Sequence, residues 1–494
     1  MGNPRLNNGE IMKKYSFILG VIFIASCAMM PSAKGVYESV KRVYAPVNYG
    51  AVADGKTLCT KAIQKAIDEC AANGGGVVRL SGGKFLSGTI FMKSNITLEI
   101  AKGSTLLGST NLADYPETVP AYRSRTDKYT NTSLIYGENL SNIAITGKGS
   151  YDGQGGKFIF GRWRLKKRPY GIRFISCTNV TMENLTLKNS PMWMQHYMAC
   201  DDVTIRNITV WNHCNRNNDM IDVDGCHNVL ISGCVGDTDD DGITLKSTSA
   251  RACENVIIRD CTISSHCNAI KAGTESNGGF KNIKILNNTV RPSAAKTCFT
   301  GLPEGDGGVS LMIVDGGTME NVIVSGMVST GPACPIFIRL GNRGRKFKPD
   351  MARPGVGTMR NITISNIKAT TDHPRGCVIS GITGHRIEKL TLKNIDFTFP
   401  GGGTEGDRKR QFDESPGKYP NPDMYRWQKG EEINRLPAFG LFFWHVEDLS
   451  LENVKLITRK PDARAAIVLE DASNVLIDGK AAKTGDNSVL FLDK

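Results

Sequence analysis

The chain has 494 residues, of which 40% are hydrophobic and 22% charged, so it is long enough for several ordinary domains or one elongated repeat architecture. These fractions exclude an intrinsically disordered chain, and the lack of repeated apolar runs of roughly 20 residues excludes a protein with many membrane spans. The formal net charge of +13 fits either a polyanionic partner or an ordinary basic surface. Because no Lys/Arg block or nucleic-acid motif accompanies this charge, we expect no nucleic-acid partner.

Residues 1–27 have the pattern of an export signal. Lys13 and Lys14 precede an apolar run over residues 17–25, which is too short to span a bilayer and has the length of a signal-peptide core. The run ends in the sequence Ile-Ala-Ser-Cys at Cys27, which resembles a bacterial lipoprotein box whose cysteine is lipidated. Ordinary cleavage after Ala28 or Ala33 is the alternative.

We therefore expect an exported protein, located in the periplasm or the outer membrane of a Gram-negative bacterium, or secreted. A lipidated Cys27 would attach the chain to a membrane. We expect a monomer.

One helix is predicted near the start of the mature chain. The apolar residues of segment 60–73 fall on one helical face, and the segment ends at a run of three glycines, 74–76. No following Lys-Ser/Thr makes this run a phosphate-binding loop, so we interpret it as a helix stop. The face consists of Ala62, Ile63, Ala66, Ile67 and Cys70.

From residue 45 to 494 the chain repeats one short sequence pattern. A polar residue, usually Asn, is followed by an alternating apolar strand and then by another Asn or Gly. Successive starts recur with a period in the twenties, and such a period without an intervening helix is typical of a parallel β-solenoid. The fold class predicted is therefore all-β: a right-handed parallel β-helix, in one domain over 45–494, with a short N-terminal helix capping the first coil. The starts used are Asn179, Asp202, Asn228, Asn255 and Asn282.

Two side-chain columns follow from this repeat. Asn residues at the same corner of successive coils are expected to form hydrogen-bonded ladders. Cys177, Cys200, Cys226 and Cys253 share one position in their coils, which predicts stacked buried thiols rather than a disulfide framework. The sequence holds no Cys-x-x-Cys pair and no His/Cys ligand spacing, so we predict neither a zinc site nor any other metal or cofactor.

An insertion rich in Gly, Pro and charge interrupts the repeat at about residues 400–437. It carries Tyr419, Tyr425 and Trp427. Because loops beside a rigid β scaffold often shape a binding cleft, we expect this insertion to border the site; a surface excursion without function is the alternative.

Acidic residues cluster on two neighbouring coils. The segment 217–222 contains Asp219 and Asp222, and the segment 237–242 contains Asp240 and Asp241. The step from Asp219 to Asp240 is close to one coil, which places the two about 4.8 Å apart along the axis. Such carboxylates repel one another, which costs stability, so we expect the cluster to have a function. Either the carboxylates bind a cation, or the repulsion raises the pKa of one carboxyl and keeps it protonated as a general acid. Inverting hydrolysis of a glycosidic bond requires one protonated and one ionised carboxyl, about 6.5–9.5 Å apart.

The sequence resembles the polygalacturonase-like glycoside hydrolases of family 28, which are right-handed parallel β-helix enzymes that cleave pectin by inversion. The resemblance extends over nearly the whole mature chain. It is carried by the segments 49–57, 74–78, 147–155, 189–193, 241–246 and 436–440.

The family's Asn-Thr-Asp motif maps onto residues 217–219 and its Gly-Asp-Asp motif onto 239–241. The resemblance implies that Asp240 is the general acid, that Asp219 and Asp241 position and deprotonate the water, and that Asn217 contacts the substrate. It also implies a pectic polysaccharide or oligosaccharide as the partner.

Two family motifs are altered. The family's Gly-His-Gly motif has only His266 nearby, one position out of register. The Arg-x-Lys pair that holds a galacturonate carboxylate would fall on residues 310–312, which are Ser-Leu-Met. Lys271, Arg339 or Arg343 is therefore expected to supply the missing charge, or to be a surface cation.

The function predicted is an inverting glycoside hydrolase for pectic polysaccharide that contains galacturonic acid, of the polygalacturonase or rhamnogalacturonan-hydrolase type. Loss of the Arg-x-Lys pair favours a rhamnogalacturonan-type or other modified glycan over plain homogalacturonan. Two alternatives stay open: a calcium-dependent pectate lyase on the same fold, and a non-catalytic polysaccharide-binding solenoid.

Overall fold

The computed structural model describes residues 42–158, 168–424, 435–482 and 489–492. The predicted export signal with Cys27 lies outside these residues, as do Tyr425 and Trp427 of the insertion. Among the described residues, no helix is both long and apolar enough to cross a membrane. The expectations about export and lipidation therefore stay predictions.

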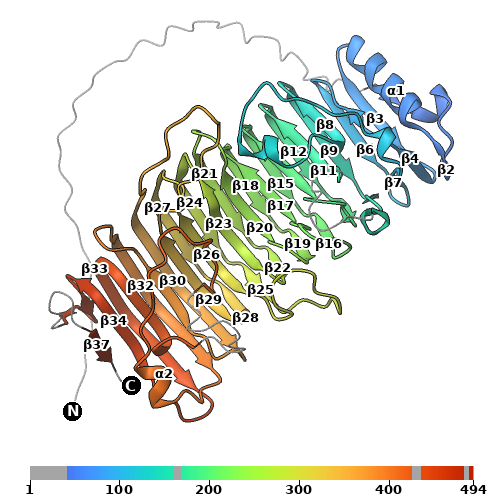
Figure 1. The fold of residues 1–494 in the computed structure, drawn as a ribbon. Coiled ribbons are helices and arrows are strands. Elements are labelled where there is room, and N and C mark those ends of the chain that lie inside the picture. Colours follow the sequence, from blue (N-terminus) through green and yellow to red (C-terminus); the bar gives the residue numbers. More distant parts are fainter. Residues whose placement is uncertain (1–41, 159–167, 425–434, 483–488, 493–494) are drawn as a thin grey trace, which may run out of the picture. The chain divides into compact units, whose positions relative to one another are not determined.

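The strands form three parallel sheets, and each strand pairs with its counterparts in the preceding and following coils (Figure 1). The first sheet comprises β1 (Val43–Tyr44), β3 (Gly76–Leu80), β6 (Ile96–Ile100), β9 (Ser141–Gly147), β12 (Thr178–Glu183), β15 (Asp201–Arg206), β18 (His227–Ser232), β21 (Cys253–Arg259), β24 (Gly279–Leu286), β27 (Thr318–Ser325), β30 (Thr358–Thr371), β32 (Ile387–Phe399), β33 (Ala438–Thr458) and β35 (Leu476–Ile477), with β36 (Lys480–Ala481) antiparallel to β35.

The second sheet comprises β2 (Asp54–Leu58), β4 (Lys84–Ser87), β7 (Thr105–Gly108), β10 (Ser150–Asp152), β13 (Thr186–Lys188), β16 (Thr209–Asn212), β19 (Val235–Thr238), β22 (Thr262–Ser265), β25 (Thr289–Val290) and β28 (Val328–Gly331), and continues into the second half of β30. The third comprises β5 (Ile90–Phe91), β8 (Ser133–Glu138), β11 (Tyr170–Ile175), β14 (Gln195–Met198), β17 (Ile221–Asp224), β20 (Ile243–Ser247), β23 (Asn268–Ser276), β26 (Gly307–Ile313), β29 (Cys334–Leu340), β31 (Cys377–Ser380), the start of β33 and β34 (Ala465–Ser473), with β37 (Val489–Leu492) antiparallel to β34.

The core lies inside the coils because alternate residues of each strand point inward. On β18, Val229 and Ile231 are buried, and the register pairs them with Val256 and Ile258 of β21. One coil cannot bury this apolar face by itself, so the hydrophobic effect favours stacking coil on coil. The predicted fold class, a right-handed parallel β-helix, is confirmed.

Asn side chains form the predicted ladder along the first sheet. Asn255 Nδ2 donates to Asn228 Oδ1 at 3.2 Å, and Asn282 Nδ2 donates to Asn255 Oδ1 at 3.1 Å. The same link joins Asn321 to Asn282 and Asn361 to Asn321. These residues have φ near +55°, a left-handed conformation that Asn tolerates better than most residues, which explains why the repeat uses Asn.

The predicted column of thiols is also present. Cys177, Cys200, Cys226 and Cys253 are buried and free of disulfides. The backbone N–H of Cys177 points at the sulfur of Cys200, and that of Cys200 at the sulfur of Cys226. Buried thiols in this column therefore act as small hydrophobic side chains between coils.

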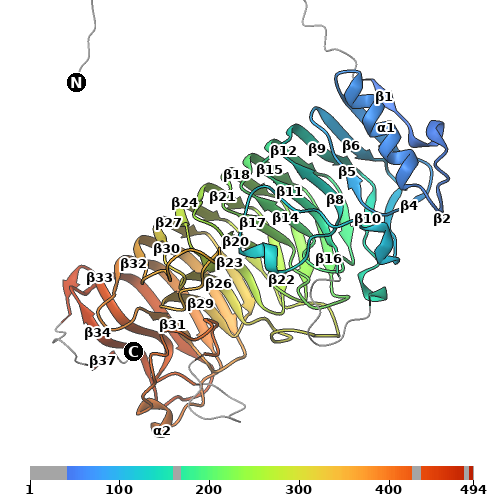
Figure 2. The ribbon, with the colours of Figure 1, turned by 45° about the horizontal axis from the view of Figure 1, so that its top comes forward.

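Helix α1 (Thr60–Ala72) caps one end of the stack, as predicted (Figure 2). Its buried residues Ile63, Ala66, Ile67 and Cys70 face the first coils, and the helix contacts β1, β3, β5 and β6. The other helices in the described part of the chain are short: η1 (Pro46–Tyr49), η2 (Leu112–Asp114), η3 (Arg125–Lys128), η4 (Gly155–Lys157) and α2 (Glu405–Arg408). Of these, α2 lies within the predicted insertion.

Candidate active site

The acidic residues come from corners of successive coils. Asp219 lies in the turn between β16 and β17, and Asp240 and Asp241 lie in the turn between β19 and β20. The register pairs Ile221 with Ile243, and the N–H of Met220 donates to the carbonyl of Asp241 at 3.0 Å. The two turns are therefore stacked, which brings the predicted carboxylates together.

Basic residues of the third sheet face the same corner. Lys246 lies on β20, and Lys271 and Glu275 lie on β23, the next strand in the stack. The register pairs Asp222 with Thr244 and Thr244 with Lys271. Because strands in register present the same face, Lys271 belongs to the side-chain row that contains Asp222.

A cavity of about 220 Å³ opens at this corner. Asp219, Asp240 and Asp241 line it together with basic, aromatic and amide side chains. The other lining residues are Tyr129, Met192, Trp193, Asn217, Lys246, Lys271, Glu275, Arg345 and Tyr419.

Asp241 is held as a carboxylate. Lys271 Nζ lies 2.5 Å from Asp241 Oδ2, and Asn268 Nδ2 donates to Asp241 Oδ1 at 2.7 Å. Burial by itself would raise the pKa of Asp241, but the charges of Lys271 and Lys246 and these hydrogen bonds outweigh it, so the pKa lies below its ordinary value. Asp241 is therefore ionised at neutral pH.

Asp240 is in a different electrostatic situation. Within the part of the chain that the structure describes, no Lys, Arg or His nitrogen lies within 4.0 Å of its carboxylate, and Oδ1 accepts a hydrogen bond from the N–H of Asp241 at 2.9 Å. Burial and the adjacent charge of Asp241 raise the pKa of Asp240 to about 6. The two neighbouring carboxyls are thus driven towards opposite protonation states.

Asp219 and Asp222 share one cation. Lys246 Nζ lies 3.2 Å from Asp222 Oδ1 and 3.8 Å from Asp219 Oδ2. Burial raises the pKa of Asp222 to about 7 although Lys246 opposes the shift. Burial, followed by the charges of Asp222 and Asp240, raises the pKa of Asp219 well above its ordinary value. The raised pKa values mean that this group of carboxyls shares at least one bound proton more readily than isolated carboxyls would.

Aromatic faces border the charged groups. Lys246 Nζ lies 4.4 Å from the centre of the Trp193 ring, a cation–π contact. The ring of Tyr419, from the predicted insertion, lies against the guanidinium carbons of Arg343 and Arg345, at 5.6 and 5.9 Å. The insertion thus contributes an aromatic side chain to the cavity.

The structure separates the predicted binding residues into two groups. Asn217 and Lys271 line the cavity, and Asn217 Oδ1 accepts a hydrogen bond from Arg168 Nη2 at 2.8 Å. His266, Arg339 and Arg343 are not among its lining residues.

Each of these three has partners elsewhere. His266 is buried beside Asp239. Arg339 donates to Ser380 Oγ and to the carbonyl of Gly381, and Arg343 pairs with Asp315 beneath Tyr419.

Six lining residues were not proposed as site residues from the sequence: Tyr129, Met192, Trp193, Lys246, Glu275 and Arg345. Trp193 and Lys246 do end segments that carry the family resemblance, 189–193 and 241–246. A further signal was the presence of Lys246, Lys271 and Glu275 inside otherwise apolar or small-residue strands, where charged residues are costly unless they are paired.

Three stacked parallel sheets with a carboxylate-lined cavity define a β-helix protein with a candidate catalytic site. The family model "Glycosyl hydrolases family 28" matches residues 77–411. The chain therefore belongs to glycosyl hydrolase family 28.

The sequence identity to individual relatives is low. An endo-polygalacturonase of Pectobacterium parmentieri is 25% identical over 404 residues, which are 78% of this chain and 94% of that protein. A probable polygalacturonase of Vitis vinifera is 32% identical over 259 residues, 48% of this chain, and the match spans 52% of that relative's length. The structure of the Yersinia enterocolitica family 28 exopolygalacturonase superposes with a TM-score of 0.67 at 19% identity, covering 90% of this chain and 79% of that one. At this identity the likeness supports the fold alone.

Proposed function

We propose that this protein is an inverting glycoside hydrolase that cleaves pectic polysaccharide containing galacturonic acid. One observation carries the proposal: two adjacent carboxyls border one cavity, and Lys271 pairs with Asp241 but not with Asp240. Inversion needs one protonated and one ionised carboxyl, and this arrangement supplies both.

In the proposed reaction Asp240 donates its proton to the oxygen of the scissile bond as the leaving sugar departs. Asp241, kept ionised by Lys271, takes a proton from the attacking water. Asp219 lies one coil away on the same corner and holds that water with Asp241. Because Asp219 and Asp241 are buried and all three carboxyls are fixed in turns of the β-helix, little reorganisation is needed as charge develops on the sugar ring.

The residues that line the cavity support an acidic sugar as substrate. Lys246, Lys271 and Arg345 provide positive charge, and Trp193 and Tyr419 provide flat faces on which a sugar ring can stack. Relatives named polygalacturonases point the same way.

Within this class we propose a rhamnogalacturonan-type or other modified pectic glycan. Ser310, which stands where the family has its arginine, pairs in register with Lys271 of the preceding coil. A cation of the preceding coil, Lys271, therefore stands beside this position, and we expect the uronate carboxylate to bind at a shifted place.

The two alternatives are less well supported. A calcium-dependent lyase would need carboxylates that are open to the ion, whereas Asp241 is paired with Lys271 and Asp222 with Lys246. A non-catalytic binding solenoid gives no reason for burying several carboxyls at one corner, since their desolvation costs stability.

We also propose export, on the basis of Lys13, Lys14 and the apolar run over residues 17–25, and a monomeric state. Mass spectrometry of the protein expressed with its native signal tests the processing: an acylated N-terminal Cys27 identifies a lipoprotein, and a free N-terminus after Ala28 or Ala33 identifies ordinary cleavage. Light scattering coupled to gel filtration tests the monomer.

The reaction is tested by incubating the protein with homogalacturonan and, separately, with rhamnogalacturonan. We expect new reducing ends without the ultraviolet absorbance of an unsaturated uronate, faster release from rhamnogalacturonan, and an initial product of inverted anomeric configuration by nuclear magnetic resonance. Unsaturated product would identify a lyase, and no product from any pectic polymer, with binding retained, would identify a binding protein.

A further inference from the structure

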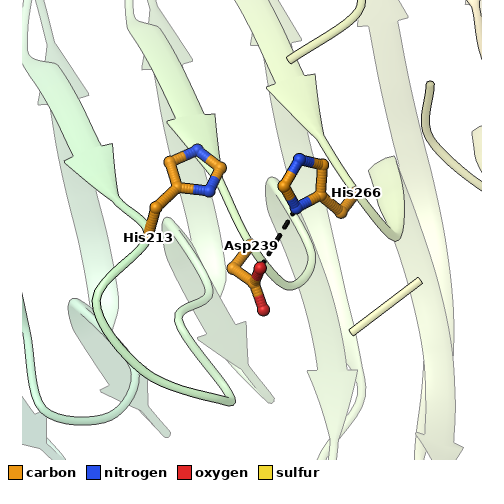
Figure 3. Close-up of side chains that lie close together, drawn as sticks. All are labelled: His213, Asp239 and His266. Atoms are coloured by element: carbon orange, nitrogen blue, oxygen red, sulfur yellow. Dashed lines mark hydrogen bonds and ion pairs between the residues drawn. The ribbon is translucent and has the colours of Figure 1, made fainter. Parts of the chain in front are cut away.

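Three residues outside the cavity form a column at one corner of the β-helix. His213, Asp239 and His266 directly follow the last residues of β16, β19 and β22. These last residues, Asn212, Thr238 and Ser265, are partners in the strand register. The three side chains therefore project from equivalent positions of successive coils (Figure 3).

The column brings together atoms that can bind a metal ion. One ring nitrogen of each histidine and one carboxylate oxygen of Asp239 all lie within 4.8 Å of one another. The three residues are buried, with exposed fractions of 8% for His213 and 0% for both Asp239 and His266. A site for a small ligand in this column is thus shielded from bulk water.

Each of the three side chains retains one buried polar atom without a hydrogen-bond partner among the described residues. These atoms are His213 Nδ1, Asp239 Oδ2 and His266 Nε2. Buried polar atoms in native proteins nearly always have partners, so three orphans in one column call for an explanation. In Figure 3 His266 Nδ1 and Asp239 Oδ1 face each other across a 3.1 Å contact, so an ion held between the three side chains would take the place of that contact and would give His213 Nδ1 a partner.

Neighbouring groups prepare His213 as a ligand. Its Nε2 lies 2.8 Å from Asp237 Oδ1, and the Asp237 carboxylate also accepts hydrogen bonds from Ser293 Oγ and the N–H of Ala294. Since this carboxylate acts as an acceptor, Nε2 carries the imidazole proton and Nδ1 presents its lone pair. A carboxylate that orients a histidine in this way is the usual arrangement behind metal-bound histidines.

We propose that His213, Asp239 and His266 bind one divalent transition-metal ion, with Zn²⁺ as the preferred ion. Two imidazoles and one carboxylate are ligands typical of zinc and leave a fourth position for water, whereas Ca²⁺ and Mg²⁺ prefer oxygen ligands. Bonds of about 2.0–2.1 Å place tetrahedral ligands roughly 3.4 Å apart. The side chains therefore have to approach one another by no more than about 1.4 Å from the 4.8 Å limit.

The ion would have a structural role next to the candidate catalytic acid. Asp239 immediately precedes Asp240, and none of the three ligands lines the cavity. A bound ion would tie three coils together at the turn that carries Asp240 and Asp241. Each ligand is separated from the next by a whole coil, so the column has no short-range ligand spacing of the kind that predicts a zinc site from a sequence.

Zinc binding is tested on tag-free protein that has been dialysed against a chelator and then against metal-free buffer. Titration with ZnCl₂ by calorimetry, with zinc content after gel filtration, is expected to give one ion per chain with micromolar or tighter affinity. His213→Asn and His266→Asn are each expected to weaken binding at least tenfold. His227→Asn is the matched control, because His227 also lies beside a carboxylate, Asp201, but outside the column, and its binding should equal that of the wild type.

The absence of saturable zinc binding to the wild-type protein would overturn the proposal, as would wild-type affinity in a folded His213→Asn/His266→Asn double variant. A second measurement does not depend on the variants folding. In wild-type crystals soaked with zinc, anomalous diffraction at the zinc edge should place a peak between His213, Asp239 and His266. A peak found only elsewhere would show that the column is a His-Asp-His ladder without an ion.

Discussion

The ammonium of Lys271 contacts Oδ2 of Asp241 at 2.5 Å, while Asp240, the preceding residue, has no such cation beside it among the described residues. This one ion pair makes two identical side chains chemically different. It lowers the pKa of Asp241 against the effect of burial, and the resulting negative charge helps to raise the pKa of Asp240 to about 6. The acid and the base of the proposed reaction are therefore assigned by a lysine one coil away.

Asp240→Asn is expected to lower kcat by about 10²–10⁴-fold, because an amide cannot donate the proton to the leaving oxygen. KM should change little, and the melting temperature should stay equal or rise since one charge leaves a crowded acidic group. Steady-state kinetics on a pectic oligosaccharide measure both parameters. Asp260→Asn, at an exposed position with φ of 56°, is the control and should keep full activity; equal activity in the two variants would remove Asp240 from the mechanism.

Lys271→Met tests the ion pair that assigns the base. Without the ammonium, Asp241 loses its main stabilising charge, so at neutral pH we expect kcat to fall by roughly tenfold or more, and KM for an acidic substrate to rise. Lys271→Arg keeps a positive charge and should retain more activity than Lys271→Met. If both variants have the same kcat as the wild type, the ion pair has no part in catalysis.

Much of the fold could be predicted because its physical causes are local and repeated. Asn255 illustrates this: its left-handed φ and its ladder bonds recur along the stack, so the sequence repeats the same residue at a similar interval. The stacking of Asp219 on the turn of Asp240 and Asp241 followed from the same period, although the register that pairs Ile221 with Ile243 aligns Asp219 with Asp241 rather than with Asp240.

What could not be predicted depends on distances across coils that the period alone does not give. His266 directly follows β22, in one column with His213 and Asp239, and is not among the residues that line the cavity, whereas Lys271 lies on β23 and lines it. The contribution of Lys246 also escaped prediction. Its pairing with Asp222 becomes visible only when the strands are placed side by side.

Asn255→Ala is expected to destabilise the β-helix by about 2 kcal/mol, because it removes two ladder hydrogen bonds and places alanine in a left-handed conformation. Asn255→Gly removes the same bonds without the conformational cost, so a loss of about 1 kcal/mol is expected. Chemical denaturation of the three proteins measures the differences. Equal stability of the alanine and glycine variants would mean that the left-handed conformation contributes nothing.

Tyr419→Ala is expected to raise KM by about three- to tenfold with little change in kcat, because the ring borders the cavity and offers a stacking face worth about 0.5–1.5 kcal/mol. Tyr419→Phe keeps the ring over Arg343 and Arg345 and should bind substrate nearly as well as the wild type. Initial rates over a range of oligosaccharide concentrations distinguish the two. A Phe variant as weak as the Ala variant would assign the effect to the hydroxyl rather than to stacking.

His196 makes the stability of the protein depend on pH. It is fully buried, and burial lowers its pKa from 6.5 to about 4 even though a hydrogen bond to Asp224 opposes the shift. As pH falls below 6.5 the unfolded chain binds a proton that the folded chain does not take up until about pH 4, so stability is lost over this window by about 1.4 kcal/mol per pH unit and about 3 kcal/mol in total. The contribution is present in full above pH 6.5.

His196→Gln removes the side chain that binds this proton in the unfolded state, while every other titrating group stays in both proteins. The difference in unfolding free energy between wild type and variant should therefore shrink by up to about 3 kcal/mol between pH 7 and pH 4. Denaturant titrations at pH 7, 6, 5 and 4 provide the comparison. Parallel stability curves for the two proteins would show that His196 binds protons equally in the folded and unfolded states, and that another group causes any acid sensitivity.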